Sequence, residues 1–211
     1  MGYLDQLLPE IERIGADVAW LANLCSDATL KRLHDFPRTV SVTVMNVSFH
    51  NCLRNYPFEA LEKDHDWIMQ MDADETLEPN APEKLAFALG KQPMLKMKMA
   101  HVWEADGKRY LTTDMGDEKD RLYNTTYKWR YLQKVVAGPT NFDIEVSPEQ
   151  SNIWVIHWGY STPEKRSFHK QRWDRLHGRS VGRNPYGLWR TINDPSFAPE
   201  IVPYDDFIKK L

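Results

Sequence analysis

Apolar and polar residues alternate along the first half of the chain in a way that predicts helices and strands in turn. Over residues 4–14, apolar side chains recur every three or four positions, which indicates a helix. Residues 17–24 form a short apolar run and residues 39–44 alternate, and both patterns are typical of strands. Between them, the Ser-Asp-Ala-Thr turn at 26–29 can cap a second helix that runs through His34.

The same order continues up to a cluster of acidic residues. Residues 48–63 predict a third helix, which Pro57 can break. Residues 66–71 predict a strand that stops at Asp-Ala-Asp-Glu, residues 72–75. Because helices that alternate with strands pack on the faces of a parallel sheet, we predict an α/β fold with a mostly parallel sheet.

The second half of the chain predicts one helix, at residues 82–89, then mainly strands, then a basic C-terminal region. Strands are expected at residues 95–99, 109–111, 121–123, 128–132, 142–146 and 153–157. A last helix is predicted from Pro163 to about His177. We therefore expect a single domain over residues 1–211, in which residues 162–211 form a basic helix and tail.

The overall composition narrows the class of protein. The 27 Lys and Arg residues are balanced by 30 Asp and Glu residues, and the formal net charge of -3 argues against a surface built throughout to coat nucleic acid. Cys25 and Cys52 fall in no metal-binding or redox spacing, which predicts free thiols in a reducing compartment and hence a cytoplasmic location. We expect no export signal and no transmembrane helix, because no apolar run approaches the roughly 18–20 residues that such a helix needs.

The acidic loop after the predicted strand at 66–71 has the chemistry of a cation site. Asp72 and Asp74 are hard oxygen ligands separated by one residue, so both can reach one Mg²⁺ or Mn²⁺ ion or the diphosphate bound to it. Open α/β sheets also bind their ligands at the ends of strands. A solvated acidic turn that caps the next helix is the alternative for so short a motif.

Five segments around this loop occur in a definite order. They are Ser-Asp-Ala-Thr at 26–29, Arg-Asn at 54–55, Asp-Trp-Ile-Met-Gln-Met-Asp-Ala-Asp-Glu at 66–75, Arg-Leu-Tyr at 121–123 and His-Trp-Gly-Tyr at 157–160. Their order and spacing over about residues 16–176 resemble family 2 glycosyltransferases.

The resemblance implies the GT-A fold, in which a Rossmann-like, mostly parallel sheet is flanked by helices. It implies an enzyme that moves a sugar from a nucleotide-diphosphate donor, expected to be a UDP-sugar, to an acceptor hydroxyl with inversion. Asp74 would be the principal metal ligand, Asp72 would lie near the metal or the ribose, and His157 would be a second protein ligand. Asp27 would lie near the nucleobase and Arg54 near the donor. An imidazole ligand favours Mn²⁺ over Mg²⁺.

Two departures from the family pattern change what is expected. The chain starts at the helix that follows the family's usual first strand, so either this strand is absent or the start is truncated. A missing strand would leave a sheet edge for a partner chain, such as a second copy, to cover. The family's His-Glu pair, whose carboxylate would be the base, is replaced by Val-Val-Ala at residues 135–137. The other candidates for the base that takes the acceptor's proton are Asp114, Asp117, Glu118 and Asp143. Asp117 is favoured because it lies in a polar loop, although surface acids in a solvated loop are the plain alternative.

The basic C-terminal region interleaves cations with aromatic residues between residues 165 and 190. Its helix can present cations such as Arg166 to the donor diphosphate, and its aromatic side chains can stack on a sugar or a base. A solvated helix face whose aromatic residues pack on the core is the alternative. The acceptor is expected to be a saccharide or, because of this basic patch, a modified base in DNA.

Two other functions fit parts of the sequence. A degenerate binding or scaffold protein that keeps the fold without catalysis would explain the absent strand and the absent His-Glu, but the two metal motifs argue against it. A metal-dependent phosphohydrolase or nuclease is disfavoured, because one acidic cluster is evident where two-metal sites need more ligands.

Overall fold

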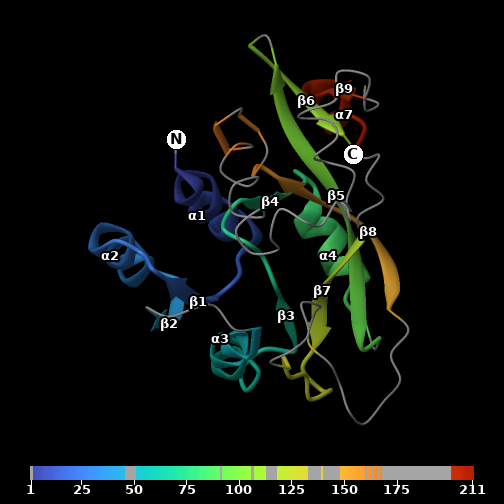
Figure 1. Ribbon diagram of the computed structural model, residues 1–211. Helices are drawn as coiled ribbons and strands as arrows, with labels where there is room; N and C mark the ends of the chain where they lie inside the picture. The colour runs from blue at the N-terminus through green and yellow to red at the C-terminus, as the bar shows by residue number, and fades with distance from the viewer. Residues whose placement is uncertain are drawn as a thin grey trace, which may run out of the picture.

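The structure, a computed structural model, describes residues 2–45, 51–90, 92–105, 107–112, 118–132, 139, 148–159, 161–162, 164–165, 167 and 201–211. Figure 1 shows the arrangement of the helices and strands. The helical elements are α1 (Tyr3–Ile14), α2 (Asp27–Asp35), the 3-10 helix η1 (Asn51–Arg54), α3 (Asn55–Leu61), α4 (Ala81–Ala88) and α7 (Tyr204–Ile208). The strands are β1 (Val18–Asn23), β2 (Thr39–Met45), β3 (Trp67–Met69), β4 (Glu75–Leu77), β5 (Met94–Ala105), β6 (Lys108–Thr112), β7 (Glu118–Asn124), β8 (Glu149–His157) and β9 (Ile201–Pro203).

The described strands form two separate sheets. β1 and β2, joined by α2, make a two-stranded parallel sheet. The larger sheet has seven strands: β3, β7, β5, β6 and β9 follow one another, β8 pairs with β5, and β4 pairs with β8. Within the seven-stranded sheet the β5–β8 pair is parallel and the other described pairs are antiparallel.

The prediction of a mostly parallel, Rossmann-like GT-A sheet is therefore wrong. Helix crossovers of the predicted kind produce one parallel pair, β1–β2, in the first part of the chain. Further along, β5 turns directly into β6 through Gly107, whose φ of 71° is the left-handed conformation that glycine adopts easily, and the two strands pair as an antiparallel hairpin. Periodicity indicates where strands lie but not which strand each one pairs with.

Two element predictions also change, and two others are not tested. The strand expected at 128–132 is an irregular segment that contains a single bridge residue, because Trp129 and Tyr131 are buried as anchors of a core cluster and not as part of a ladder. β4 lies where only an acidic loop was expected. The strand expected at 142–146 lies outside the described residues, as does most of the helix expected from 163 to 177.

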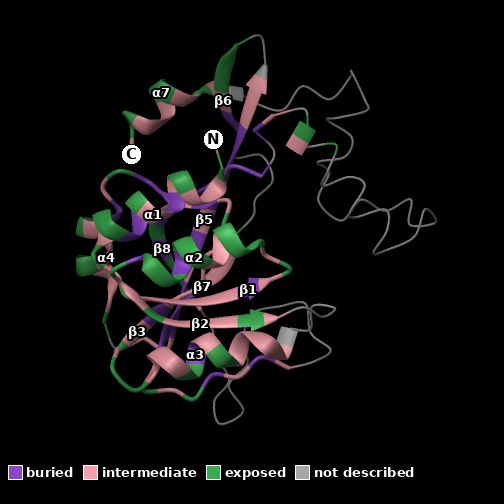
Figure 2. Cartoon of the chain, turned by 90° about the vertical axis from the view of Figure 1, so that its left-hand side faces the viewer, coloured by how far each residue is buried: buried purple, intermediate pink, exposed green. Residues whose placement is uncertain are grey.

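The seven-stranded sheet is covered on both faces. Odd-numbered and even-numbered residues of β5, whose side chains point to opposite faces, are both buried. Leu95, Met97 and Met99 pack on one face against residues of α1 and α4. On the other face, Phe58 of α3 packs near Met94, while α7 packs further along the same strand. Figure 2 shows buried residues along β5, β7 and β8, whereas β1 and β2 are mainly intermediate or exposed.

Helix α1 fixes the end of β4. The Glu10 carboxylate accepts a hydrogen bond from the backbone N–H of Leu77 at 2.8 Å, and Arg13 donates to the carbonyl oxygen of Glu78 at 2.9 Å. Such charge-assisted bonds to backbone groups are stronger than neutral ones. They hold the strand that follows the acidic loop. Of the described helices, none combines the length and the apolar character needed to cross a membrane.

Candidate functional site

The acidic loop, residues 72–75, is held in place by a buried ion pair of its last residue. Glu75 is 1% exposed, and its carboxylate contacts the guanidinium of Arg121, which projects from β7. The other Glu75 oxygen accepts the backbone N–H of Asp72 at 2.9 Å, and the N–H of Glu75 returns to the carbonyl oxygen of Asp72 at 3.1 Å. Carboxylate and backbone together close a tight turn at residues 72–75.

This turn brings Asp74 against His157, the last residue of β8. The Asp74 Oδ2 atom lies 3.3 Å from His157 Nε2, and the two side chains are 15% and 12% exposed. Glu75 pairs with His157 in the β4–β8 ladder, and the N–H of Trp158 donates to the carbonyl oxygen of Asp74 at 2.7 Å. Backbone pairing therefore places one carboxylate oxygen and one imidazole nitrogen side by side.

Gly159 leaves the space that this pair occupies. A Cβ atom at this position would lie 2.5 Å from Asp74 Oδ2 and 2.8 Å from His157 Nε2, closer than real Cβ contacts come. Any larger residue would have to displace one of the two side chains. Gly159, two residues after His157, is therefore part of the site.

A second histidine, His101, contacts His157 through the ring nitrogen of His157 that does not face Asp74. His101 of β5 lies opposite His157 in the parallel β5–β8 pair, and the Nδ1 atoms of the two rings are 3.0 Å apart. One Nδ1 must donate and the other must accept at this distance. If His157 presents the lone pair of Nε2 to a cation, its Nδ1 carries the proton and His101 accepts it. His101 is 3% exposed, so the packing around it fixes this contact.

The other side of the loop gathers positive charge around Asp72. Arg121 lies 3.5 Å and Arg54 lies 3.9 Å from the Asp72 carboxylate. The side-chain oxygen of Gln70 accepts from Arg54 at 2.8 Å and from Arg121 at 3.3 Å, and its amide nitrogen donates to the hydroxyl of Tyr131. The Asp72 carboxylate thus lies near two arginine side chains, whereas the Asp74 carboxylate lies next to His157.

Burial changes the acid–base properties of the groups beneath the loop. It raises the pKa of Glu75 to about 7, against the lowering effect of the positive charge of Arg121 and with a further rise from the charge of Asp72. Burial also raises the pKa of Tyr131 to about 12, so this phenol stays protonated and can donate. Glu75 can therefore change its charge near neutral pH.

The rim beside Asp74 is formed by the start of α1 and by Lys165. The Lys165 ammonium lies 4.5 Å from the ring centroid of Tyr3 and donates to the hydroxyl of Ser161 at 3.0 Å. Burial lowers the pKa of Lys165 and raises that of Tyr3, and the charge of Asp74 adds to the rise for Tyr3. One cation and one phenol thus flank the Asp74–His157 pair.

The structure brings some of the predicted site residues together and leaves others apart. Asp72, Asp74, His157 and Arg54 gather at the acidic loop. Asp27 is exposed at the start of α2, and none of the described contacts joins it to that loop. Within the described ranges there is no group of three or more His, Cys, Asp and Glu side chains arranged for a metal ion.

Several predictions fall outside the part of the chain that the structure describes. These are the candidate bases Asp114, Asp117 and Asp143, the donor contact Arg166, and most of the basic region, residues 168–200. Glu118 is described: it begins β7, is exposed, and accepts from the amide of Gln150.

The sequence reasoning missed the supporting residues. Arg121 and Gly159 lie in the Arg-Leu-Tyr and His-Trp-Gly-Tyr segments, whose pattern predicts a strand and a motif but gives neither residue a supporting role. His101 carried no local signal, because its role depends on the pairing of β5 with β8. The burial of Arg121 has no clear local signal either, because three charged residues precede it in β7 and its buried partner, Glu75, comes from a distant segment.

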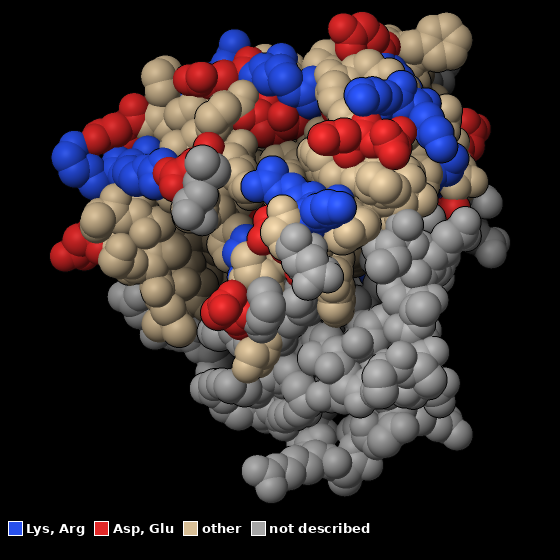
Figure 3. All heavy atoms as spheres, turned by 90° about the horizontal axis from the view of Figure 1, so that it is seen from above, with Lys and Arg blue, Asp and Glu red and all other residues tan. Residues whose placement is uncertain are grey.

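Charged side chains of both signs share the described part of one face of the molecule. On the face shown in Figure 3, acidic and basic side chains are interspersed over the residues that the structure describes. A scan against protein-family models finds no match to this chain, and a search of curated proteins finds no similar sequence.

Proposed function

We propose that this chain is a metal-dependent glycosyltransferase that takes a sugar from a nucleotide-diphosphate donor and passes it to an acceptor hydroxyl. The observation that carries the proposal is the contact of Asp74 with His157 at 3.3 Å, in the space left by Gly159. These residues are far apart in the sequence, and a partly open carboxylate–imidazole pair at the end of an acidic loop has the chemistry of a cation site.

The residues fit a cation that the donor helps to bind. Asp74 and His157 supply two ligands, and phosphate oxygens and water normally complete the shell of Mg²⁺ or Mn²⁺ in such sites. The nitrogen of His157 favours Mn²⁺. When bound, the cation would neutralise the charge that develops on the departing diphosphate.

The neighbouring residues would bind and orient the donor. Arg54, whose side chain is 28% exposed, can offer its guanidinium to a phosphate oxygen. Asp72 is oriented by two arginines and can accept a hydrogen bond from a ribose hydroxyl. Tyr3 and Lys165 at the rim can contact the sugar.

The finer assignments remain part of the proposal. A UDP-sugar donor, a saccharide acceptor, inversion, and a base supplied by Asp117 or Asp143 follow from the sequence resemblance. The cytoplasmic location depends on Cys25 and Cys52, which are both free thiols here. A scaffold function without catalysis is favoured by one observation, the engagement of Asp72 by two arginines.

Calorimetric titration with UDP-, GDP-, dTDP- and CDP-sugars, with and without Mn²⁺, tests the proposal. We expect one donor to bind only with Mn²⁺, and Asp74→Asn to abolish this binding. Asp35→Asn, which changes an exposed carboxylate at the end of α2, is the matched control and should bind normally. If the folded chain binds no donor at all, the transferase proposal is wrong and the scaffold is favoured.

A further inference from the structure

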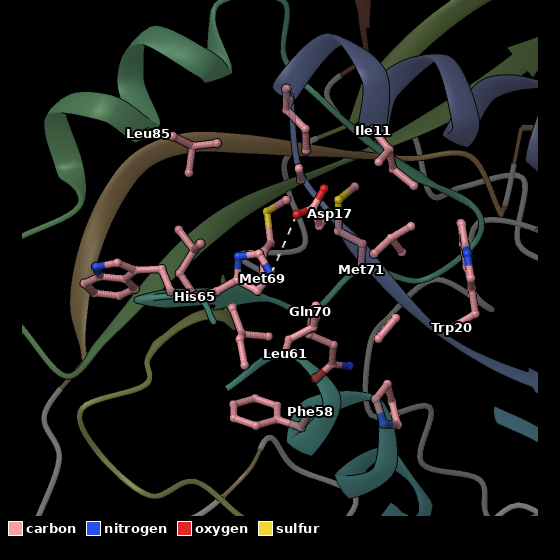
Figure 4. A pocket seen from close by; sticks show the side chains of 18 of the residues that line it. Ile11, Asp17, Trp20, Phe58, Leu61, His65, Met69, Gln70, Met71 and Leu85 are labelled. Atoms are coloured by element: carbon pink, nitrogen blue, oxygen red, sulfur yellow. Dashed lines mark ion pairs between the residues drawn. The ribbon is translucent and has the colours of Figure 1, made fainter. Parts of the chain in front are cut away.

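The two sheets are separated by an apolar cavity of about 670 Å³. Figure 4 shows side chains that line it, among them Ile11, Phe58, Leu61 and Leu85. The volume lies within the range of about 300–1,000 Å³ that is typical of ligand sites. A cavity of this size can hold a ligand, and the groups that form its walls indicate the shape of that ligand.

The sides of the cavity are two strand edges. Residues 14–21, which include most of β1, and residues 67–73, which include β3, line it without interruption. Successive side chains of a strand point to opposite faces, so a strand that lines a cavity with every residue presents its edge. In the described part of the chain β1 pairs with β2 alone and β3 with β7 alone. Each strand therefore has an edge that can hydrogen-bond across the cavity.

The other two walls are apolar helix faces. Leu7 and Ile11 of α1, with Leu85 of α4, cover one face, and Phe58 and Leu61 of α3 cover the other. Two hydrogen-bonding edges and two apolar faces match the four sides of an extended peptide. A small apolar ligand would fill the volume but would leave the strand edges without partners.

The sequence of β1 agrees with this reading. The segment Val-Ala-Trp-Leu-Ala at 18–22 is apolar at every position, as in strands that are buried on both faces. In the structure only Ala22 is buried, and residues 18–21 are half-buried. The composition of β1 thus fits a central strand, whereas the strand lies at an edge.

We propose that this cavity binds an extended apolar segment of a separate polypeptide, which adds a strand between β1 and β3 and joins the two sheets. The starts of β1 and β3 lie at the same end of the cavity, where His65 Nε2 is 3.8 Å from Asp17 Oδ2. Arg54, Asp72 and Ala73 line the cavity as well. The added strand therefore passes close to the candidate site, although the proposal does not depend on the function of that site.

The occupant is a separate polypeptide and not a second copy of this chain. Each described strand is already paired within its own sheet, so a second copy could supply one of these strands only by giving up one of its ladders. An added strand from another polypeptide gains main-chain hydrogen bonds on both edges and apolar contacts on both faces.

The test uses a synthetic peptide of alternating Val and Ile residues with lysines at both ends, and a copy that is N-methylated at alternate positions. N-methylation removes the donors along one edge and keeps the apolar side chains. We expect the plain peptide to bind in calorimetry, to slow amide exchange in β1 and β3, and to bind at least tenfold more tightly than the methylated copy.

Variants locate the binding site. Leu85→Glu on α4 and Leu61→Glu on α3 each place a charge in the cavity and should weaken binding at least tenfold. Phe87→Glu is the matched control, because Phe87 lies on α4 but is 95% exposed, and it should bind normally. Using one variant on each face keeps the test valid if either fails to fold.

Three results would overturn the proposal. The first is a folded chain that does not bind the plain peptide, and the second is equal binding of the methylated copy, which would indicate an apolar site without strand pairing. The third is a dimer of the chain alone whose β1 and β3 amides are protected without peptide, which would make a second copy the occupant.

Discussion

The missing side chain of Gly159 is the most specific requirement of the candidate site. In Gly159→Ala the new Cβ would lie 2.5 Å from Asp74 Oδ2 and 2.7 Å from His157 Cε1, so the Asp74–His157 pair must separate. We expect Mn²⁺ affinity to fall about 10–100-fold, the size of loss seen when support for a metal ligand is removed. Titration of the purified variant with Mn²⁺, followed by electron paramagnetic resonance, measures this.

Gly90→Ala is the matched control for that substitution. Its Cβ would meet only the flexible end of the Gln92 side chain, at 2.7 Å from Oε1, so the neighbour can move away. Mn²⁺ affinity should be unchanged in this variant. Equal affinities in both variants would show that Asp74 and His157 do not share a cation.

His101 acts on the site through His157 and is a positioning residue. In His101→Phe an aromatic ring is kept, but His101 Nδ1, which lies 3.0 Å from His157 Nδ1 in the wild type, is lost. His157 then lacks the group that would accept its Nδ1 proton when Nε2 faces a cation. We expect Mn²⁺ affinity to fall about tenfold or more, with the fold retained. His101→Gln, which offers an acceptor again, should restore part of the affinity. His34→Phe on the exposed side of α2 is the control, and a similar loss there would contradict the role of His101.

At the scale of elements, the Arg121–Glu75 pair joins β7 to the turn before β4. Arg121→Met leaves Glu75 buried without its main cation, and removing one partner of a buried pair costs about 3–5 kcal/mol. The free energy of unfolding should therefore fall by about this amount at about pH 8. Urea unfolding in the presence of a chelator measures it without interference from bound metal.

The loss should depend on pH in a definite direction. In the wild type the folded pKa of Glu75, about 7, is above its ordinary value of 4.5, so the stability it contributes is complete below 4.5 and is lost as pH rises through 7. Arg121 opposes this rise, and without it the folded pKa increases further. The cost of Arg121→Met should thus be smaller at about pH 5.5, where the carboxyl group is neutral, than at about pH 8.

Arg130→Met provides the comparison for a partly exposed pair. Arg130 contacts Glu62 at 2.9 Å with a side chain that is 33% exposed, and such pairs contribute about 0–1 kcal/mol. Its loss should be small and nearly the same at both pH values. If Arg121→Met behaves in the same way, the buried pair does not stabilise the turn.

The positions of most described strands could be predicted from the sequence, but their pairing could not. The alternation of Leu95, Met97 and Met99 with lysines located part of β5, yet the strand continues to Ala105 and turns back on itself. β4 was missed because Glu75 is charged, and its burial depends on Arg121 from a distant strand. Local pattern reports local conformation, while register and pairing are decided by contacts between distant segments.

The same distinction holds for the site at the scale of the whole molecule. The ordered motifs predicted that Asp72, Asp74 and His157 belong to one site, and Asp74 and His157 do lie together. They did not predict that Asp72 would turn to Arg54 and Arg121. Which carboxylate meets the histidine depends on the turn that Glu75 closes, and hence on the whole sheet.

Because the described strands form two separate sheets, we expect that the molecule does not unfold as a single cooperative unit. The seven-stranded sheet holds three buried clusters, whereas a two-stranded sheet is marginally stable by itself, and Val40 and Val44 of β2 are 48% and 44% exposed. We expect native-state hydrogen exchange to show that amides of β1 and β2 exchange through a local opening. Its free energy should be at least about 2 kcal/mol below that for amides of β5 and β8. The contrary result is that amides of all four strands have the same opening free energy and that this free energy falls equally with urea concentration. The two sheets would then unfold together as one cooperative unit, in spite of the cavity between them.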